Sequence, residues 1–175
     1  MELNKEQVYK LGDIEDVKKF IVGGKAFLTL ESKKTGRWFT FKIKKAKKDD
    51  EKSPYFVSVL TGSDNENAYT YMGTIFKNDD KLNFRLTKKS TITEEALSYK
   101  AFNFFINLLL VNKIHEDMGV YHRGMCCVCG KALTTPESIK SGMGPICDGR
   151  FNLQLDIKDV RKKKLQKLNR KLISK

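Results

Sequence analysis

The chain has 175 residues and a formal net charge of +13 at pH 7, because 34 Lys and Arg outnumber 21 Asp and Glu. Apolar residues make up 40% of it, including 11 Phe and 6 Tyr, which is enough for a folded core and argues against a wholly disordered chain. No apolar run approaches the roughly 18–20 residues that a membrane span needs, and residues 1–5 lack the apolar stretch of a secretory signal. We therefore expect a soluble cytoplasmic protein of one domain, or one domain with a small appendage, and no membrane partner.

The first half of the chain predicts one short helix followed by strands. Residues 13–22 have apolar positions at helical spacing and are followed by Gly23 and Gly24, which end a helix. The period then changes to two, and turn residues separate five strand-like segments. These predicted strands are residues 25–32, 37–45, 55–61, 68–76 and 82–87. Their short connections indicate an antiparallel meander or a small open barrel.

A long helix is predicted after the strands, from Thr93, a suitable N-cap residue, to about Asn112. Its apolar face is expected to cover the side of the sheet that carries Phe39 and Phe84. The residues assigned to that face are Leu97, Ala101, Phe104, Phe105, Leu108 and Leu109. The predicted fold class is therefore α+β, with a five-stranded antiparallel sheet or small open barrel backed by one long helix.

The rest of the chain consists of a cysteine-rich module and, from Asp156 onward, a basic helix with apolar residues at roughly helical intervals. Shifts in composition divide the whole chain into four predicted segments. They are an N-terminal helical segment (1–24), the sheet with its long helix (25–114), a zinc-binding module (115–150) and a basic C-terminal helix or tail (151–175).

Positive charge is concentrated in two blocks. Residues 25–92 carry 15 basic and 8 acidic groups, and residues 158–175 carry 9 and 1. Concentrated positive charge attracts a polyanion, and nucleic acid is the commonest one. The alternative is a lysine-rich composition with a solvated tail. The tail residues expected to contact phosphates are Arg161, Lys162, Lys163, Lys164, Lys167, Arg170 and Lys171.

One face of the predicted sheet combines an aromatic residue with cations. In the second predicted strand, alternation places Trp38, Lys42 and Lys44 on the side opposite Phe39. Arg85 of the last predicted strand is expected on the same side as Trp38. Proteins bind single-stranded nucleic acid in this way, with bases stacked on aromatic rings and phosphates on cations. The competing interpretation is that Trp38 packs under a loop or under the N-terminal helix, and that the lysines keep a sheet edge soluble.

All four cysteines lie between residues 126 and 147, which favours a metal site over a disulfide framework. Cys126 and Cys129, followed by Gly130, have the spacing of a zinc knuckle. Cys147 comes directly after a Gly-Pro-Ile segment, which is typical of a helix start, where the helix dipole favours a thiolate.

A tetrahedral zinc site needs a fourth ligand. His122 is the first choice, because it is one of only two histidines and lies close to the thiols in the sequence. The alternatives are Asp148, Cys127 and His115. A thiol next to a knuckle cysteine is usually a small packed residue, so Cys127 is expected to be a bystander.

The cysteine module also carries a wider pattern. After His122 come Cys126-x-x-Cys129-Gly, then Leu133-Thr-x-Pro-x-Ser138, and then Gly142-x-Gly-Pro-x-Cys147. This pattern resembles an uncharacterised zinc-ribbon-like domain family that is widespread in bacteriophages and in phage-derived bacterial proteins. The upstream segments 27–41, 55–62 and 69–73 resemble the region that often precedes that domain, so the resemblance covers about residues 20–150. It implies zinc, a phage-like origin and a bacterial or phage-infected host cell, but no particular activity. The extra Cys127 departs from the pattern and leaves open which thiol of the pair binds the metal.

One structural zinc ion is expected, because three thiolates and an imidazole leave no open coordination position. A module of this size with few large apolar groups cannot bury enough surface to fold alone. Structural zinc supplies roughly 10–16 kcal/mol of apparent binding free energy, which is enough to order it.

Residues suited to catalysis are few. The sequence has no P-loop, dinucleotide fingerprint or nucleophile elbow, and Asp64 with Glu66 is the only acidic pair worth testing as part of a two-metal nuclease. The leading prediction is a zinc-stabilised, non-enzymatic nucleic-acid-binding protein. The alternatives are a phage protein-interaction module, which would inhibit a host or defence complex or belong to a virion, and a metal-dependent nuclease.

Overall fold

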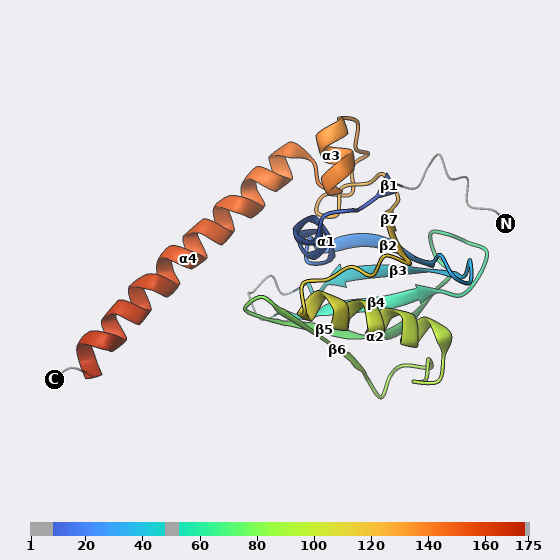
Figure 1. Ribbon diagram of the computed structural model, residues 1–175, viewed down its shortest axis with the longest axis horizontal. Helices are drawn as coiled ribbons and strands as arrows, with labels where there is room; N and C mark the ends of the chain where they lie inside the picture. Colours follow the sequence, from blue (N-terminus) through green and yellow to red (C-terminus); the bar gives the residue numbers. More distant parts are fainter. Residues whose placement is uncertain (1–8, 48–52, 174–175) are drawn as a thin grey trace. The chain divides into compact units, whose positions relative to one another are not determined.

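The computed structural model describes residues 9–47 and 53–173 (Figure 1). Contacts between Cα atoms divide the chain after Met143 into two compact units. The described residues of the first unit form the sheet and the helices α1, α2 and α3. The second consists of one helix, α4 (Pro145–Ile173).

The first unit is built on an open antiparallel sheet with the strand order β1-β7-β2-β3-β4-β5-β6. The five predicted strands are confirmed within a few residues, but the predicted number of strands is wrong. The strands are β1 (Tyr9–Lys10), β2 (Lys25–Ser32), β3 (Trp38–Lys45), β4 (Tyr55–Leu60), β5 (Tyr69–Asn78), β6 (Lys81–Leu86) and β7 (Met118–His122).

The two strands that the sequence did not predict lie together at one edge of the sheet. β1 has two residues, which is too short for an alternating pattern, and it pairs with β7. β7 pairs with β2, so Leu28 lies opposite His122. The sheet therefore includes β1 from the predicted N-terminal segment (1–24) and β7 from the predicted zinc-binding module (115–150).

Local sequence explains where the short helices begin and end. α1 (Ile14–Ile21) starts after Asp13, whose carboxylate accepts hydrogen bonds from the backbone N–H groups of the first turn at 2.8 and 3.3 Å. α3 (Pro136–Ser141) starts with a capping box between Thr135 and Ser138 and ends at Gly142, which has a φ of 72°. Much of the Leu-Thr-x-Pro-x-Ser…Gly pattern therefore encodes the two ends of this helix.

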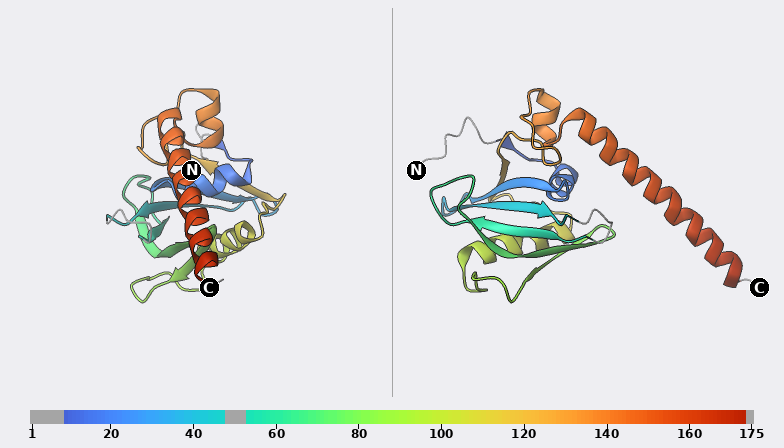
Figure 2. Two further views of the ribbon diagram at one scale, coloured as in Figure 1. Left: turned by 90° about the vertical axis from the view of Figure 1, so that its left-hand side faces the viewer. Right: turned by 180° about the vertical axis from the view of Figure 1, so that it is seen from behind.

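The long predicted helix is α2 (Leu97–Leu110), and it packs on the predicted side of the sheet. The ring of Phe102 lies 4.7 Å from that of Phe41 and 4.9 Å from that of Phe84, measured between centroids. α1 lies on the same side, with the ring of Phe20 5.6 Å from that of His122 (Figure 2). The helix starts later than predicted, because its N-cap is Ala96 and not Thr93.

The predicted buried face of α2 is partly wrong. The helix buries Phe102, Phe105, Ile106 and Leu109, whereas Leu97 and Phe104 are about half exposed. The helix is apolar around most of its circumference, so its sequence period is compatible with more than one buried stripe. Contact with Phe41 and Phe84 selects the stripe centred on Phe102.

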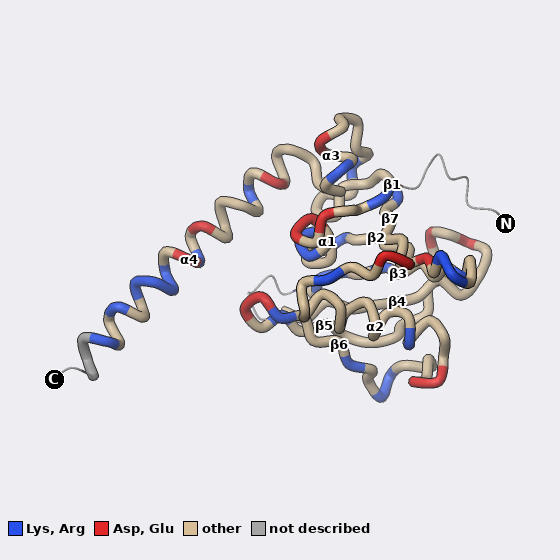
Figure 3. The backbone as a smooth tube through the Cα atoms, viewed as in Figure 1, with Lys and Arg blue, Asp and Glu red and all other residues tan. Residues whose placement is uncertain are grey.

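The second unit, α4, begins at Pro145, which confirms the predicted helix start before Cys147. Its basic residues gather in the C-terminal half (Figure 3), and every residue from 156 to 170 is exposed. The predicted phosphate contacts Arg161–Lys164, Lys167 and Arg170 therefore lie on an exposed helix, whereas the side chain of Lys171 falls outside the described residues. Within the described part of the chain, no helix is long and apolar enough to cross a bilayer.

The two stripes of α2 give a paired stability prediction. We expect Phe102→Ala to lower the free energy of unfolding by about 3–5 kcal/mol, because the fully buried ring leaves a cavity between α2 and the sheet. Phe104→Ala, on the same helix, should change it by less than about 1 kcal/mol. Urea denaturation followed by circular dichroism measures both, and equal losses would contradict the assigned buried face.

Candidate metal centre and the second face of the sheet

A short hairpin carries the first two cysteines. The N–H of Cys126 donates to the carbonyl of Lys131 at 2.8 Å, and the N–H of Gly130 donates back to the carbonyl of Cys126 at 2.9 Å. Gly130 has a φ of 79°, which a residue with a Cβ adopts only with strain. This geometry is the predicted knuckle, in which a tight turn aims two thiols the same way.

The knuckle is attached to the rest of the first unit through Cys127. Its carbonyl accepts the N–H of Lys25 at the start of β2 at 2.7 Å, and its N–H donates to the carbonyl of Gly142 at 3.1 Å. The fully buried thiol of Cys127 packs against Gly23, where an added Cβ would collide with it. Cys127 is thus a packed residue that joins the knuckle to β2 and the end of α3.

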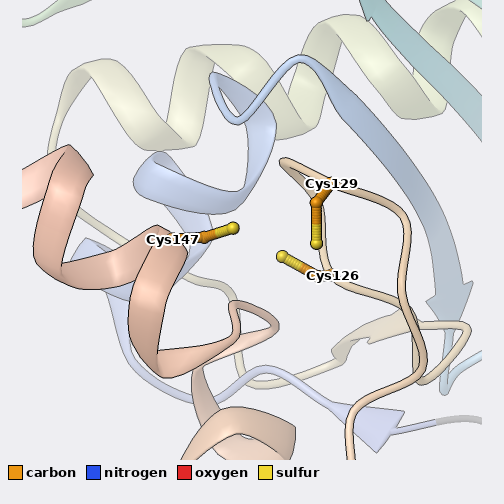
Figure 4. A group of neighbouring side chains, drawn as sticks. All are labelled: Cys126, Cys129 and Cys147. Carbon is orange, nitrogen blue, oxygen red and sulfur yellow. The ribbon is translucent and has the colours of Figure 1, made fainter.

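Three thiols come together. The Sγ atoms of Cys126, Cys129 and Cys147 lie within 4.8 Å of one another (Figure 4). The edge of a tetrahedral zinc–thiolate site, with Zn–S near 2.3 Å, is about 3.8 Å. The 4.8 Å limit on the sulfur separations is about 1 Å longer than this edge. The donor set could hold a metal ion, and its soft thiolates suit zinc better than a hard cation.

The structure does not bring the predicted fourth ligand, His122, into this group. Its ring is buried, Nδ1 accepts the N–H of Gly124 at 3.0 Å, and Nε2 lies 2.8 Å from the carbonyl of Ile139, to which it donates in the neutral form. Both ring nitrogens are therefore used in joining β7 to the knuckle and to α3. Burial lowers the pKa of His122, which favours that neutral form.

The other candidates for the fourth ligand are also outside the group of three. Cys127 packs on Gly23, and Asp148 accepts a hydrogen bond from the side chain of Asn152 at 3.0 Å. His115 accepts the N–H of Asp117 at 3.2 Å in the loop before β7.

The second face of the sheet, opposite α1 and α2, carries aromatic and basic side chains. We call it the aromatic–basic face. The predicted residues of this face are Trp38, Lys42, Lys44 and Arg85, and the structure places all four on it. In β3, Trp38, Lys42 and Lys44 alternate with the buried residues Phe41 and Ile43. Arg85 is on the same face because the register joins it to Lys44 through Thr74 and Phe56. The sequence interpretation missed further members, which are Lys25, Phe27, Phe56, Tyr69, Tyr71 and Arg123.

One row of this face crosses five neighbouring strands. The register places Lys25, Lys44, Phe56, Thr74 and Arg85 side by side, from β2 to β6. Five strands span about 19 Å. Phe56 is 44% exposed between Lys44 and Arg85 and packs edge-on against Tyr71 at 6.3 Å. Alternation in β4, where Tyr55 and Val57 are buried, is the sequence signal that could have found it.

A second cluster lies beside that row. The ammonium of Lys42 lies 4.9 Å from the ring centre of Tyr69 and 5.6 Å from that of Phe27, and the guanidinium of Arg123 lies 4.5 Å from the ring centre of Phe27. Burial and the positive charge of neighbouring Lys44 lower the pKa of Lys42. The carboxylate of Glu66, which pairs with Arg123, raises the pKa of Lys42 and so offsets part of this positive charge.

The acidic pair that could have indicated a nuclease forms a turn. The carboxylate of Asp64 accepts hydrogen bonds from the N–H groups of Glu66 and Asn67, at 2.8 and 3.2 Å, and from the Asn67 side chain at 3.0 Å. These hydrogen bonds lower the pKa of Asp64. Glu66 forms an ion pair with Arg123. Asp64 thus shapes the β4–β5 turn from within, and Glu66 joins that turn to Arg123 of the aromatic–basic face.

Comparison with known proteins agrees with the cysteine pattern but adds no activity. Residues 116–152 match DUF6011, a family of unknown function. This segment contains β7, the knuckle, α3 and all three clustered thiols, and it is less than half of the chain. Neither the curated proteins nor the solved structures contain a match.

The buried imidazole makes stability depend on pH. As the pH falls below the ordinary histidine value of 6.5, the unfolded chain binds a proton at His122 while the folded chain does not, because its pKa is lowered. The free energy of unfolding should therefore decrease, by up to about 1.4 kcal/mol per pH unit, until the folded form also titrates. Urea denaturation of the wild type and of His122→Gln between about pH 7.5 and 5.5 isolates the contribution of His122. The same pH dependence of the free energy of unfolding in both proteins would contradict the prediction.

Proposed function

We propose that this chain is a zinc-stabilised, non-enzymatic nucleic-acid-binding protein that uses the aromatic–basic face and the basic half of α4. The observation that carries the proposal is the row from Lys25 to Arg85, in which an exposed aromatic ring lies among cations on one face of the sheet. The resemblance of the cysteine pattern to a phage-associated family favours a phage origin.

The zinc part of the proposal rests on the chemistry of the thiols. Zinc commonly binds four ligands in proteins, with thiolates on short knuckles. We assign Cys126, Cys129 and Cys147 to one ion. Three thiolates reduce the Lewis acidity of the ion, which favours a structural role even though His122 does not supply the fourth ligand. Coordination of zinc would cross-link a cysteine module that buries few large apolar side chains, among them Leu133 and Met143.

The nucleic-acid part rests on the arrangement of rings and charges. Aromatic side chains on an exposed sheet stack on bases, while neighbouring cations neutralise phosphates. Trp38 and Phe56, which are 41% and 44% exposed, are available for stacking, and Phe76 on the same face is 41% exposed. Lys44 is next to Phe56 along the row and Arg85 lies beyond Thr74 on its other side, so cations for phosphates lie on both sides of a ring that can stack on a base. This face is on the side of the sheet away from the hydrophobic packing with α2.

Metal analysis tests the first part. We expect purified protein to contain about one zinc per chain and to lose it in Cys126→Ser, Cys129→Ser or Cys147→Ser. Cys127→Ser is the matched control and should keep the metal, because that thiol packs against Gly23. His122→Gln should keep it as well, since both ring nitrogens are hydrogen bonded. If Cys127→Ser loses zinc and Cys126→Ser keeps it, the knuckle ligand is Cys127 and our assignment of Cys126 is wrong.

Oligonucleotide binding tests the second part. Fluorescence anisotropy with labelled strands of about 20 nucleotides should give a plot of log K against log salt with a negative slope. Lys44→Ala and Arg85→Ala should each reduce the slope by about 0.7 for single strands. Phe56→Ala should weaken binding by about 1–3 kcal/mol without changing the slope.

One control, one direct readout of stacking and one truncation accompany this measurement. Phe104→Ala removes an equally exposed ring from the other side of the sheet and should leave affinity unchanged. Trp38 is the only tryptophan, so quenching of its fluorescence reports stacking directly. Truncation after Ile157 should weaken binding through loss of phosphate contacts. Binding that is absent or insensitive to salt would contradict the proposal and favour a protein-interaction module, and cleavage of the strand with added magnesium would favour a nuclease.

A further inference from the structure

Two cations and a buried hydroxyl meet on the aromatic–basic face, beside the row from Lys25 to Arg85. The guanidinium of Arg123 and the ammonium of Lys42 lie 4.5 and 5.6 Å from the same ring centre, that of Phe27. The hydroxyl of Tyr69 is buried and has no hydrogen-bond partner of normal geometry in the described part of the chain, although Arg123 is close enough to affect its pKa. We call these four residues the cation cluster. A buried hydroxyl without a partner is unfavourable unless a ligand or water satisfies it.

The β4–β5 turn, residues 61–68, contacts the cation cluster, and Figure 1 shows it extending past β3 towards β2. Glu66 of this turn forms an ion pair with Arg123. The same guanidinium donates to the carbonyl of Asn65 at 3.3 Å, and the ammonium of Lys42 donates to the carbonyl of Glu66 at 3.4 Å. The turn thus supplies acceptor oxygens to both cations, and one of these oxygens belongs to a carboxylate.

The contact between the turn and the cluster is polar and exposed. Residues 62–67, Gly-Ser-Asp-Asn-Glu-Asn, are all exposed and contain no apolar side chain. In the ion pair, the side chain of Glu66 is 66% exposed and that of Arg123 is 30% exposed, so water and salt screen the attraction. The carboxylate of Asp64 accepts the N–H groups of Glu66 and Asn67 within the turn. A competing anion can therefore displace the Glu66 carboxylate without breaking the hydrogen bonds that shape the turn.

The donors of the cation cluster suit the oxygens of a phosphate group. A guanidinium binds phosphate through two parallel N–H groups, and an ammonium contributes a point charge. Burial raises the pKa of Tyr69, so its hydroxyl keeps the proton that it can donate. The ion pair with Glu66 already places a negatively charged oxygen on the guanidinium of Arg123. A phosphate has more oxygens than a carboxylate, and so it can use all three donors at once.

We propose that the cation cluster binds one phosphate of a nucleic-acid strand, and that the carboxylate of Glu66 occupies this site in the free protein. The phosphate takes the place of the carboxylate and accepts hydrogen bonds from Arg123, Lys42 and the hydroxyl of Tyr69. This inference rests on the proposed function, because the row has to hold the rest of the strand. Lys42 is two residues from Lys44 in β3, a distance of about 7 Å, so a strand bound at the row reaches the cluster.

Competition by Glu66 favours a strand over a single small anion. The carboxylate belongs to the same chain, so its effective concentration at Arg123 is high. A free phosphate ion has to displace it with no other contact, whereas a strand already held by the row displaces it in an intramolecular step. The expected result is a higher affinity for a polyanion than for a single anion.

Removal of the competing charge is the first test. Glu66→Gln keeps the size of the side chain and should bind a labelled single strand of about 20 nucleotides about two- to five-fold more tightly than the wild type, in fluorescence anisotropy at constant salt. Asp80→Asn is the matched control, because it removes one exposed negative charge from the β5–β6 turn at the other end of the sheet. It should change the affinity by less than about two-fold. Equal affinities of Glu66→Gln and the wild type would overturn the inference.

A double-mutant cycle separates local competition from a general effect of charge. Arg123→Gln should weaken binding of the same strand several-fold and reduce the slope of log K against log salt by about 0.7. In the Arg123→Gln background, Glu66→Gln should no longer strengthen binding, because the site that its charge blocked is gone. An equal gain in both backgrounds would refute local competition. Circular dichroism checks the fold of each variant, and Lys42→Gln provides the same comparison if Arg123→Gln unfolds.

Inorganic phosphate, used without nucleic acid, separates this inference from the proposed function. In a nuclear magnetic resonance titration, millimolar phosphate should shift the side-chain N–H signal of Arg123 in Glu66→Gln, and at lower concentrations than in the wild type. Strand binding with no such shift in Glu66→Gln would overturn this inference and leave the proposed function standing. A shift with phosphate but no binding of any strand would contradict the proposed function and would exclude the strand as the occupant of this site.

Discussion

The packing of α2 on one side of the antiparallel sheet is the interaction on which the other surfaces depend. Phe102 lies between Phe41 and Phe84, and this contact decides which stripe of a largely apolar helix is buried. Since α1 and α2 share that side, the opposite face of the sheet keeps its rings and cations. The proposed nucleic-acid-binding face is therefore a consequence of this helix–sheet contact.

The cysteine module is tied into the same unit by backbone contacts before any metal is considered. Cys127 bonds to the start of β2 and to the end of α3, and His122 joins β7 to Gly124 and Ile139. Gly23 and Gly142 allow the close approach, because a side chain at either position would collide with Cys127 or Phe20. A metal ion would therefore stabilise a knuckle whose position is already determined by hydrogen bonds and packing.

Charge is distributed differently in the two units. In the first unit, cations on the second face lie next to aromatic rings and are partly desolvated, as the lowered pKa of Lys42 indicates. In the C-terminal half of α4 the described cations are exposed and not interleaved with aromatic rings. Partly buried charge next to rings provides short-range, directional contacts, whereas exposed charge on a helix provides salt-dependent attraction over a longer distance.

The sequence by itself determined the local features: the β2–β3 hairpin, the cap at Asp13, the knuckle at Cys126 and Cys129, and the helix start before Cys147. Each depends on neighbouring residues, through alternation, capping or turn geometry. The tertiary structure alone decided that β7 joins the sheet, that Phe102 and not Phe104 is buried, and that His122 is hydrogen bonded within the core. These outcomes depend on contacts between residues far apart in the chain, and the periodicity of a single segment contains no information about its partners.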